Sequence, residues 1–222
     1  MFAIESLSKV YISQHGTVRA LDDISLAVER GSFVVVTGGS GSGKTTLLLT
    51  LGGLIRPTAG SVTFSGKTIY GMSEPELAEY RNRKIGFVLQ TFNLIPYLTA
   101  MENVMLPMIF NSDRNGTAQT TAEDLLEKVG LKDRKEHLPR ELSVGQQQRV
   151  AIARALANGP EVILADEPTG NLDPNLSLEV LRILKELNET EGRTVIMVTH
   201  SPEAAKFGSR RLHLKNGRIE SN

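Results

Sequence analysis

The sequence contains no cysteine and no tryptophan, and aromatic residues make up only 5% of it. Without cysteine, the chain can form neither disulfides nor thiolate metal sites. The 25 lysine and arginine residues balance the 25 aspartate and glutamate residues, so no bulk charge attracts nucleic acid or anionic lipid. We therefore expect no nucleic-acid partner.

Long apolar runs are also missing. The segment Leu47–Ile55 is among the longest, yet Thr50 and two glycines interrupt it, and it falls far short of the ~18 residues of a membrane span. The first residues, Met1–Glu5, lack the basic and apolar regions of a signal peptide. These absences predict a soluble, cytoplasmic chain whose association with a membrane would depend on a partner.

Segments rich in β-forming residues alternate with helix-like segments, which predicts an α/β fold. The predicted strands are Phe2–Leu7, Ser25–Val28, Phe33–Thr37, Ser61–Phe64, Val162–Ala165 and Thr194–Thr199. The predicted helices are Glu74–Arg83, Thr120–Val129, Ser143–Asn158 and Ser177–Glu189, and the predicted surface loop between helices is Asn111–Gln119. Because the last two strands are almost entirely apolar and flank a helix, we expect a parallel sheet covered on both faces.

A glycine-rich loop follows the strand Phe33–Thr37 and precedes a helix-like segment. It matches the phosphate-binding pattern G-x-x-x-x-G-K-[ST] with Gly38, Gly39, Ser40, Gly41, Ser42, Gly43, Lys44 and Thr45. Glycine lets successive backbone N–H groups point at a phosphate, and the helix start adds positive charge. We expect Lys44 to reach the β- and γ-phosphates, the Thr45 hydroxyl to hold Mg²⁺, and Thr46 to complete the ATP contacts. The alternative is a flexible Gly/Ser loop.

Polar residues follow three apolar strands, at the sheet edge where open parallel sheets bind ligands. Asp166 is expected to hold Mg²⁺ through water, and Glu167 to deprotonate the attacking water. His200 would hydrogen-bond the γ-phosphate or hold Glu167 in place. Gln90, after Ile85–Leu89, would sense Mg²⁺ and the water. The alternatives for the Asp166-Glu167 pair and for His200 are a solvated Asp-Glu-Pro turn and a structural histidine, and a glutamine by itself is a weak signal.

A second helix start suited to an anion lies at Ser143, a good N-cap, and Gly145 leaves the amides of the first turn open. Local physics alone favours an ordinary helix cap. The run Leu142–Leu156, however, resembles the signature motif of ABC-type ATPases, with Val144 where that family has glycine. The complete ordered set of motifs is similar to that family: the phosphate loop, Gln90, the signature, Asp166-Glu167, Asn171-Leu172-Asp173 and His200.

This resemblance covers essentially the whole chain and implies one ABC ATPase domain, 1–222. It implies a P-loop NTPase (RecA-like) core with an N-terminal antiparallel β region at 1–90 and 158–222, and a helical subdomain at 91–157. It also implies an ATP-driven homodimer in which the signature of one copy covers the ATP of the other. The residues expected to reach across are Ser143, Gly145, Gln146 and Asp173.

The resemblance further implies ATP and Mg²⁺ as cofactors and adenine stacking on Tyr11, for which a half-buried strand tyrosine is the alternative. The apolar segment Thr91–Val104 lies where the family contacts an integral membrane permease subunit; its alternative role is core packing. The sequence of this segment, together with Asn171 and the Asp173-Pro174 turn, resembles that of the lipoprotein-releasing and macrolide-exporter subgroup. This resemblance implies a place on the inner face of the cell membrane. Competing hypotheses are a soluble ABC ATPase acting on nucleic acid or ribosomes, and a P-loop kinase.

Overall fold

The computed structural model describes residues 1–14, 16–110 and 117–220. The strands are β1 (Phe2–Ser13), β2 (Gly16–Val28), β3 (Phe33–Thr37), β4 (Ala59–Phe64), β5 (Lys67–Thr68), β6 (Ile85–Leu89), β7 (Val162–Asp166), β8 (Thr194–Thr199), β9 (Arg210–Lys215) and β10 (Arg218–Glu220). The helices are α1 (Lys44–Leu51), α2 (Glu74–Lys84), α3 (Ala100–Met105), α4 (Ala118–Lys128), α5 (Val144–Leu156), α6 (Pro174–Glu189) and α7 (Pro202–Ala205). Within these described ranges, no helix is both long and apolar enough to span a bilayer.

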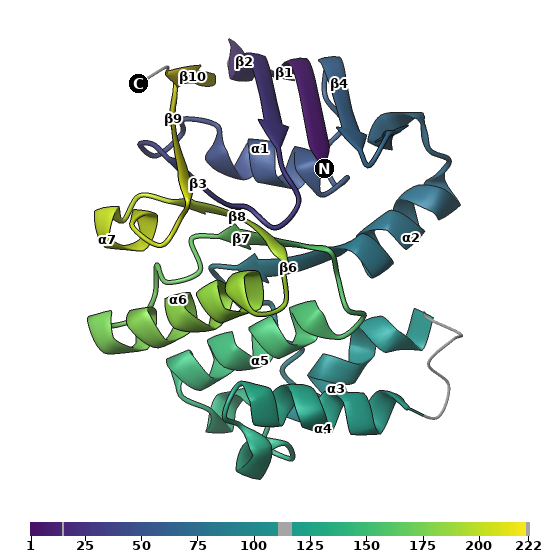
Figure 1. The fold of residues 1–222 in the computed structure, drawn as a ribbon, viewed down its shortest axis with the longest axis vertical. Helices are drawn as coiled ribbons and strands as arrows, with labels where there is room; N and C mark the ends of the chain where they lie inside the picture. Colours follow the sequence, from purple (N-terminus) through teal and green to yellow (C-terminus); the bar gives the residue numbers. More distant parts are fainter. Residues whose placement is uncertain (15, 111–116, 221–222) are drawn as a thin grey trace.

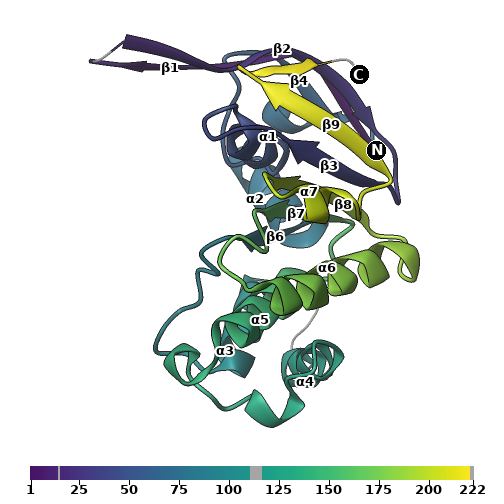
Figure 2. The same ribbon diagram turned by 90° about the vertical axis from the view of Figure 1, so that its left-hand side faces the viewer.

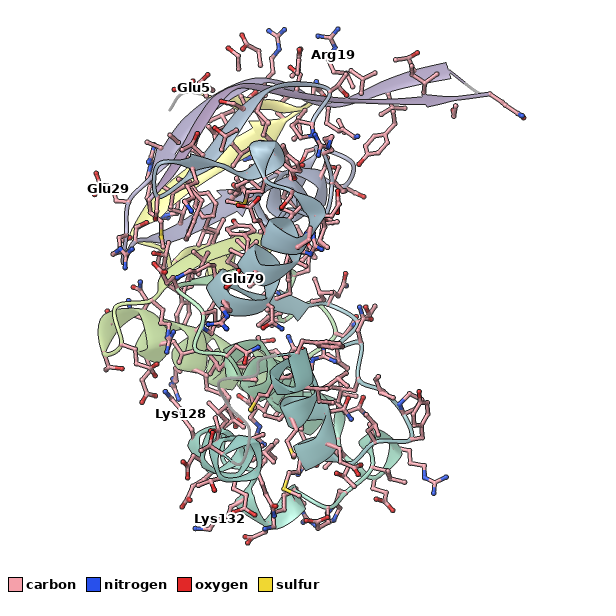
Figure 3. The ribbon with its side chains drawn as sticks, turned by 90° about the vertical axis from the view of Figure 1, so that its right-hand side faces the viewer. Glu5, Arg19, Glu29, Glu79, Lys128 and Lys132 are labelled. Carbon is pink, nitrogen blue, oxygen red and sulfur yellow. The ribbon has the colours of Figure 1, made fainter. Side chains whose placement is uncertain are left out.

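The strands form two sheets. The smaller has the antiparallel order β2-β1-β4-β5, and the larger has the order β10-β9-β3-β8-β7-β6, in which β6, β7, β8, β3 and β9 run parallel. Figure 1 shows α1 between the two sheets, with α5 and α6 on the opposite face of the larger one. Glu5 and Arg19 project from the outer face of the smaller sheet (Figure 3).

Alternate side chains of β3 serve two apolar cores, as the period of a strand requires. Val34 and Val36 pack in the cluster that includes α1 and the smaller sheet. Phe33 and Val35 pack in the cluster that includes α5 and α6, and this cluster continues into α3 and α4. The predicted parallel sheet with both faces covered is therefore confirmed.

The structure differs from the predicted elements in several places. β1 and β2 are longer than predicted because left-handed residues, Ser6 at φ 45° and Asp23 at φ 54°, accompany register shifts that let pairing continue. Their hairpin projects beyond the body of the molecule (Figure 2). β9 and β10 were not predicted, because their exposed polar residues hide the strand pattern. Of the predicted loop Asn111–Gln119, residues 111–116 lie outside the described residues, and its last two belong to α4.

Candidate nucleotide-binding site

The phosphate loop runs from the end of β3 into the first turn of α1, as predicted. Gly38 and Gly43 have φ values of 155° and 105°, which L-residues with side chains rarely adopt. A Cβ on Gly38 would lie 2.2 Å from the Leu214 carbonyl oxygen, and one on Gly43 would lie 2.1 Å from the Ala20 carbonyl oxygen. The loop is thus pressed against its own chain, which holds its backbone in a fixed shape.

Two polar side chains are enclosed by this loop. The Lys44 ammonium donates to the carbonyl oxygens of Gly38 at 2.8 Å and Gly39 at 2.9 Å, and the residue is only 8% exposed. The Ser42 hydroxyl oxygen is buried without a hydrogen-bond partner among the described residues. A buried cation and a buried hydroxyl beside a helix start form a site that fits a phosphate group.

Thr45 and Asp166 meet at the edge of the sheet. The Thr45 hydroxyl, in the first turn of α1, donates to Asp166 Oδ1 at 3.0 Å. Burial, followed by the charge of Glu167, raises the pKa of the Asp166 carboxyl, while the Thr45 hydrogen bond and Lys44 act in the opposite direction. Two oxygen ligands, one of them a partly buried carboxylate, match what Mg²⁺ prefers.

Glu167 follows directly in a left-handed conformation with φ 44°, which is unusual for a residue with a side chain. Its Oε2 accepts from the Thr199 hydroxyl at 3.0 Å and from the His200 backbone N–H at 3.3 Å. Its Oε1 lies 2.9 Å from His200 Nδ1. Of the two roles considered for His200, the structure therefore contains the contact with Glu167. The sequence analysis missed Thr199, whose signal was a hydroxyl at the buried end of the neighbouring strand.

Gln90 lies beside the same edge, after β6. Its backbone carbonyl accepts from Asn171 Nδ2 at 2.9 Å, and its side-chain amide lies against Gly170. The loop after Gln90 contains two consecutive left-handed residues, Phe92 and Asn93, with φ 54° and 50°. Arg154 of α5 donates to both of their carbonyls at 2.6 Å, a long-range contact that the sequence analysis did not identify.

The residues expected to reach a second copy lie at helix starts. Ser143 caps α5: its hydroxyl accepts from the Gln146 N–H at 3.3 Å, and its own N–H donates to Gln146 Oε1 at 2.9 Å. Asp173 caps α6 through the first-turn amides. A Cβ on Gly145 would lie 2.9 Å from the methyl carbons of Leu176, so the Leu176 side chain would have to shift to admit it. In the described part of the chain, no hydrogen bond joins these groups to the phosphate loop.

Two further predicted features are exposed. Tyr11 is 41% exposed in β1, opposite Val18 of β2, and the Lys9 ammonium lies 5.0 Å from the centre of its ring. Tyr11 is therefore a partly exposed strand residue, which both the stacking role and the half-buried strand tyrosine allow. Val144, the departure from the glycine of the signature, is 45% exposed, so its side chain is accommodated without disturbing the first turn of α5.

Comparisons with known proteins identify the family of the chain. A family model described as ABC transporter matches residues 21–170. The lipoprotein-releasing system ATP-binding protein LolD of Bordetella pertussis is 44% identical over 97% of this chain and 94% of that protein. The macrolide export ATP-binding/permease protein MacB of Syntrophobacter fumaroxidans is 47% identical over 99% of this chain, which spans 31% of that longer protein.

A solved structure supports the fold as well. The ATP-binding cassette MJ0796, as a dimer in a post-hydrolysis state bound to ADP and Pi, matches with a TM-score of 0.91 and 42% identity, covering 100% of this chain and 97% of that one. These matches favour a transporter subunit over the soluble ABC ATPase and the P-loop kinase. The fold is that of a P-loop NTPase core with an antiparallel β region and a helical subdomain. The chain therefore belongs to the ABC transporter family, as its ATP-binding, ATP-hydrolysing subunit.

Proposed function

We propose that this chain hydrolyses ATP with Mg²⁺ in a head-to-tail homodimer and thereby drives a separate integral membrane permease subunit. The observation that carries the proposal is the set of hydrogen-bonded pairs, Thr45 with Asp166 and Glu167 with His200, at the sheet edge beside the phosphate loop. Thr45 and Asp166 would bind a cation, Glu167 would act as a base, and His200 would orient Glu167, all next to one phosphate site. That combination suits hydrolysis of a phosphoanhydride.

Within one copy, the phosphate loop residues Gly38–Thr46 would hold the triphosphate. The Lys44 ammonium would turn from the loop carbonyls to the β- and γ-phosphates, where its charge is most useful. Thr45, Asp166 and Gln90 would hold Mg²⁺, which when bound neutralises phosphate charge. Tyr11 would stack on the adenine base.

Glu167 would orient the attacking water and accept its proton. Its carboxylate is nearly enclosed, with 14% of the side chain exposed, whereas the His200 side chain is 68% exposed. His200 and Thr199 would keep this carboxylate aimed along the sheet edge. With Nδ1 donating to Glu167, a neutral His200 ring leaves Nε2 as an acceptor, so a donor role toward phosphate would require a protonated ring.

The second copy would complete the site. Ser143, Gly145, Gln146 and Asp173 would contact the ATP held by the partner's phosphate loop. In support, Ser143 and Asp173 begin adjacent helices, α5 and α6, whose first turns touch through Gly145 and Leu176. Two capped helix starts side by side offer a concentration of N–H groups for an anion. The likeness to a dimeric cassette bound to ADP and Pi supports the same arrangement.

The membrane subunit would dock in a groove of about 970 Å³ between α2, β6 and α5. It includes Phe87 of β6, Arg154 of α5, and Glu79, which projects from α2 (Figure 3). Phe110, which is 80% exposed, lines its rim, and Tyr97, in the segment Thr91–Val104 expected to contact the permease, is 76% exposed. Exposed aromatic residues beside a groove are typical of a protein interface.

We further propose that the subunit serves a lipoprotein-releasing or macrolide-exporting type of permease, from the inner face of the cell membrane. The similarity to LolD and MacB supports this subgroup. We retain the division into a core, 1–90 and 158–222, and a helical subdomain, 91–157, as a proposal. The three helices α3, α4 and α5 of that middle segment pack on one another.

The membrane role is tested by capture from detergent-solubilised native membranes with the tagged chain as bait. We expect a polytopic membrane protein to be recovered, and Phe110→Asp to reduce its yield because the substitution charges the rim of the groove. Ile109→Asp is the matched control: Ile109 is also exposed, at 70%, but does not line the groove. Recovery of ribosomes or nucleic acid instead, or equal yields with both variants, would contradict the docking proposal.

A further inference from the structure

Gln148 connects the signature helix to the candidate base. It lies in the second turn of α5 and is fully buried, at 0% exposure. Its side-chain Nε2 donates to the Pro168 carbonyl oxygen at 2.7 Å. Pro168 directly follows Glu167, so this single bond joins α5 to the turn that carries the carboxylate.

The turn needs such a support. Glu167 adopts φ 44°, a conformation that costs free energy in a residue with a side chain and persists only where neighbours enforce it. Two backbone hydrogen bonds contribute to this support. The Glu167 N–H donates to the Val198 carbonyl oxygen at 3.0 Å, and the Gly170 N–H donates to the Glu167 carbonyl oxygen at 3.0 Å. The first comes from β8 and the second from within the turn. Gln148 supplies a side-chain bond from the third direction, that of α5.

We infer that Gln148 is a positioning residue for Glu167, and that it makes the aim of the carboxylate depend on where α5 is seated. The start of α5 carries Ser143 and Gly145, which we propose contact the ATP of the second copy. A shift of α5 on forming that contact is passed through the Gln148 amide to the turn at Pro168. Each site would then be aligned for hydrolysis when its own copy has engaged the partner's ATP. The inference rests on the proposed function of Glu167.

The environment of Gln148 allows a clean substitution. Its Oε1 is buried without a hydrogen-bond partner among the described residues, so the bond to Pro168 is its described polar contact. Methionine has a similar length and no donor, and it would leave the Pro168 carbonyl unsatisfied in a space of nearly the same size. Gln147 provides a control on the same helix, because its amide donates to a different backbone carbonyl, that of Leu142, at 3.1 Å.

The experiment compares Gln148→Met and Gln147→Met in steady-state phosphate release, ATP binding and hydrogen exchange. We expect Gln148→Met to lower kcat about 10- to 100-fold, because the Glu167 carboxylate is no longer held in its aligned position, with unchanged ATP affinity. The Gly170 amide should exchange faster, because the turn is released. Gln147→Met should match the wild type in all three. Gln148→Asn, which keeps the amide one methylene shorter, should lower kcat as well and serves if the methionine variant does not fold.

Glu167→Gln, measured in parallel, separates this inference from the function on which it rests. Wild-type turnover by Glu167→Gln would overturn the proposed base, whatever Gln148 does. Slow turnover by Glu167→Gln with wild-type turnover by Gln148→Met would overturn the positioning role alone. Loss of ATP affinity in parallel with kcat would show a merely structural role and also overturn it. In a double variant that carries both Glu167→Gln and Gln148→Met, we expect turnover no lower than in Glu167→Gln alone, since the carboxylate that Gln148 positions is gone.

Discussion

The edge of the larger sheet and the starts of α5 and α6 both carry predicted ATP contacts, but their side chains are engaged differently. At the sheet edge, groups from different helices and strands bond to one another, as Thr45 at the start of α1 does to Asp166 at the end of β7, and His200 after β8 to Glu167 after β7. At the helix starts, the Ser143 and Asp173 side chains bond to amides of their own helices. The first region is assembled within one chain. The second is preformed, and in the described part of the chain neither the Ser143 nor the Asp173 side chain hydrogen-bonds to the first, as expected if each region completes the other in a dimer.

The comparison is tested most strongly at the sheet edge. Glu167→Gln should lower the rate of ATP hydrolysis by roughly 10²–10⁴-fold, because it removes the proton acceptor while keeping the size of the side chain. ATP binding should remain, so the ATP-bound dimer should accumulate in light scattering. Glu203→Gln, on an exposed residue of α7, removes the same charge elsewhere and should turn over normally. Wild-type hydrolysis by Glu167→Gln would withdraw the base assignment.

The next largest effect tests whether packing against the rest of the same chain holds the backbone of the phosphate loop in shape. Gly43→Ala should lower the free energy of unfolding by about 2 kcal/mol or more, because alanine is strained at φ 105° and its Cβ meets the Ala20 carbonyl. Gly39→Ala is the control within the same loop, since a Cβ there has nothing within 4 Å. Thermal unfolding without nucleotide measures both. Equal melting temperatures would show that the loop is not held by its neighbours.

The helix starts are tested by Ser143→Ala, which should lower turnover about tenfold while ATP binding to the monomer remains, since one phosphate hydrogen bond is lost. The same change removes a helix cap, worth about 1 kcal/mol. Ser143→Asp separates the two effects, because aspartate keeps the cap but repels phosphate.

Ser73→Ala is the matched control, because Ser73 begins α2 with the same capping-box pattern. We expect it to lower stability like Ser143→Ala and to leave turnover unchanged. If Ser143→Asp turned over normally, or if Ser143→Ala weakened ATP binding to the monomer as much as turnover, the contact across the dimer would be wrong.

The sequence predicted features that depend on short-range pattern. The phosphate loop was predictable because its glycines, its lysine and the flanking strand and helix are contiguous. The meeting of Glu167 and His200 followed from one topological rule, that parallel strands end at the same edge. Contacts that depend on how distant segments pack were not predictable, such as Thr199 with Glu167 or Gln148 with Pro168. Hydroxyl and amide side chains are too common for a single sequence to mark which of them is buried against a partner.

The smallest effect distinguishes a site built for a cation from one built for stability. Burial and Glu167 raise the pKa of Asp166 in the folded protein, so folding opposes its ionisation. Its charge therefore costs stability above that raised pKa, and the cost disappears below the usual aspartate range, where both folded and unfolded chains are protonated. Asp166→Asn should accordingly raise the melting temperature without nucleotide at neutral pH, with the gain vanishing in acid.

Asp22 provides a control of opposite sign. Hydrogen bonds from Arg19 and then Arg218 lower the pKa of Asp22, so its charge favours folding at neutral pH, and this contribution is lost as pH falls through its lowered pKa. Asp22→Asn should therefore lower the melting temperature at neutral pH while Asp166→Asn raises it. Added ATP and Mg²⁺ should stabilise Asp166→Asn less than the wild type, because the cation has lost its carboxylate. If Asp166→Asn were destabilising without nucleotide, the carboxylate would be part of the scaffold and not a site held ready for a cation.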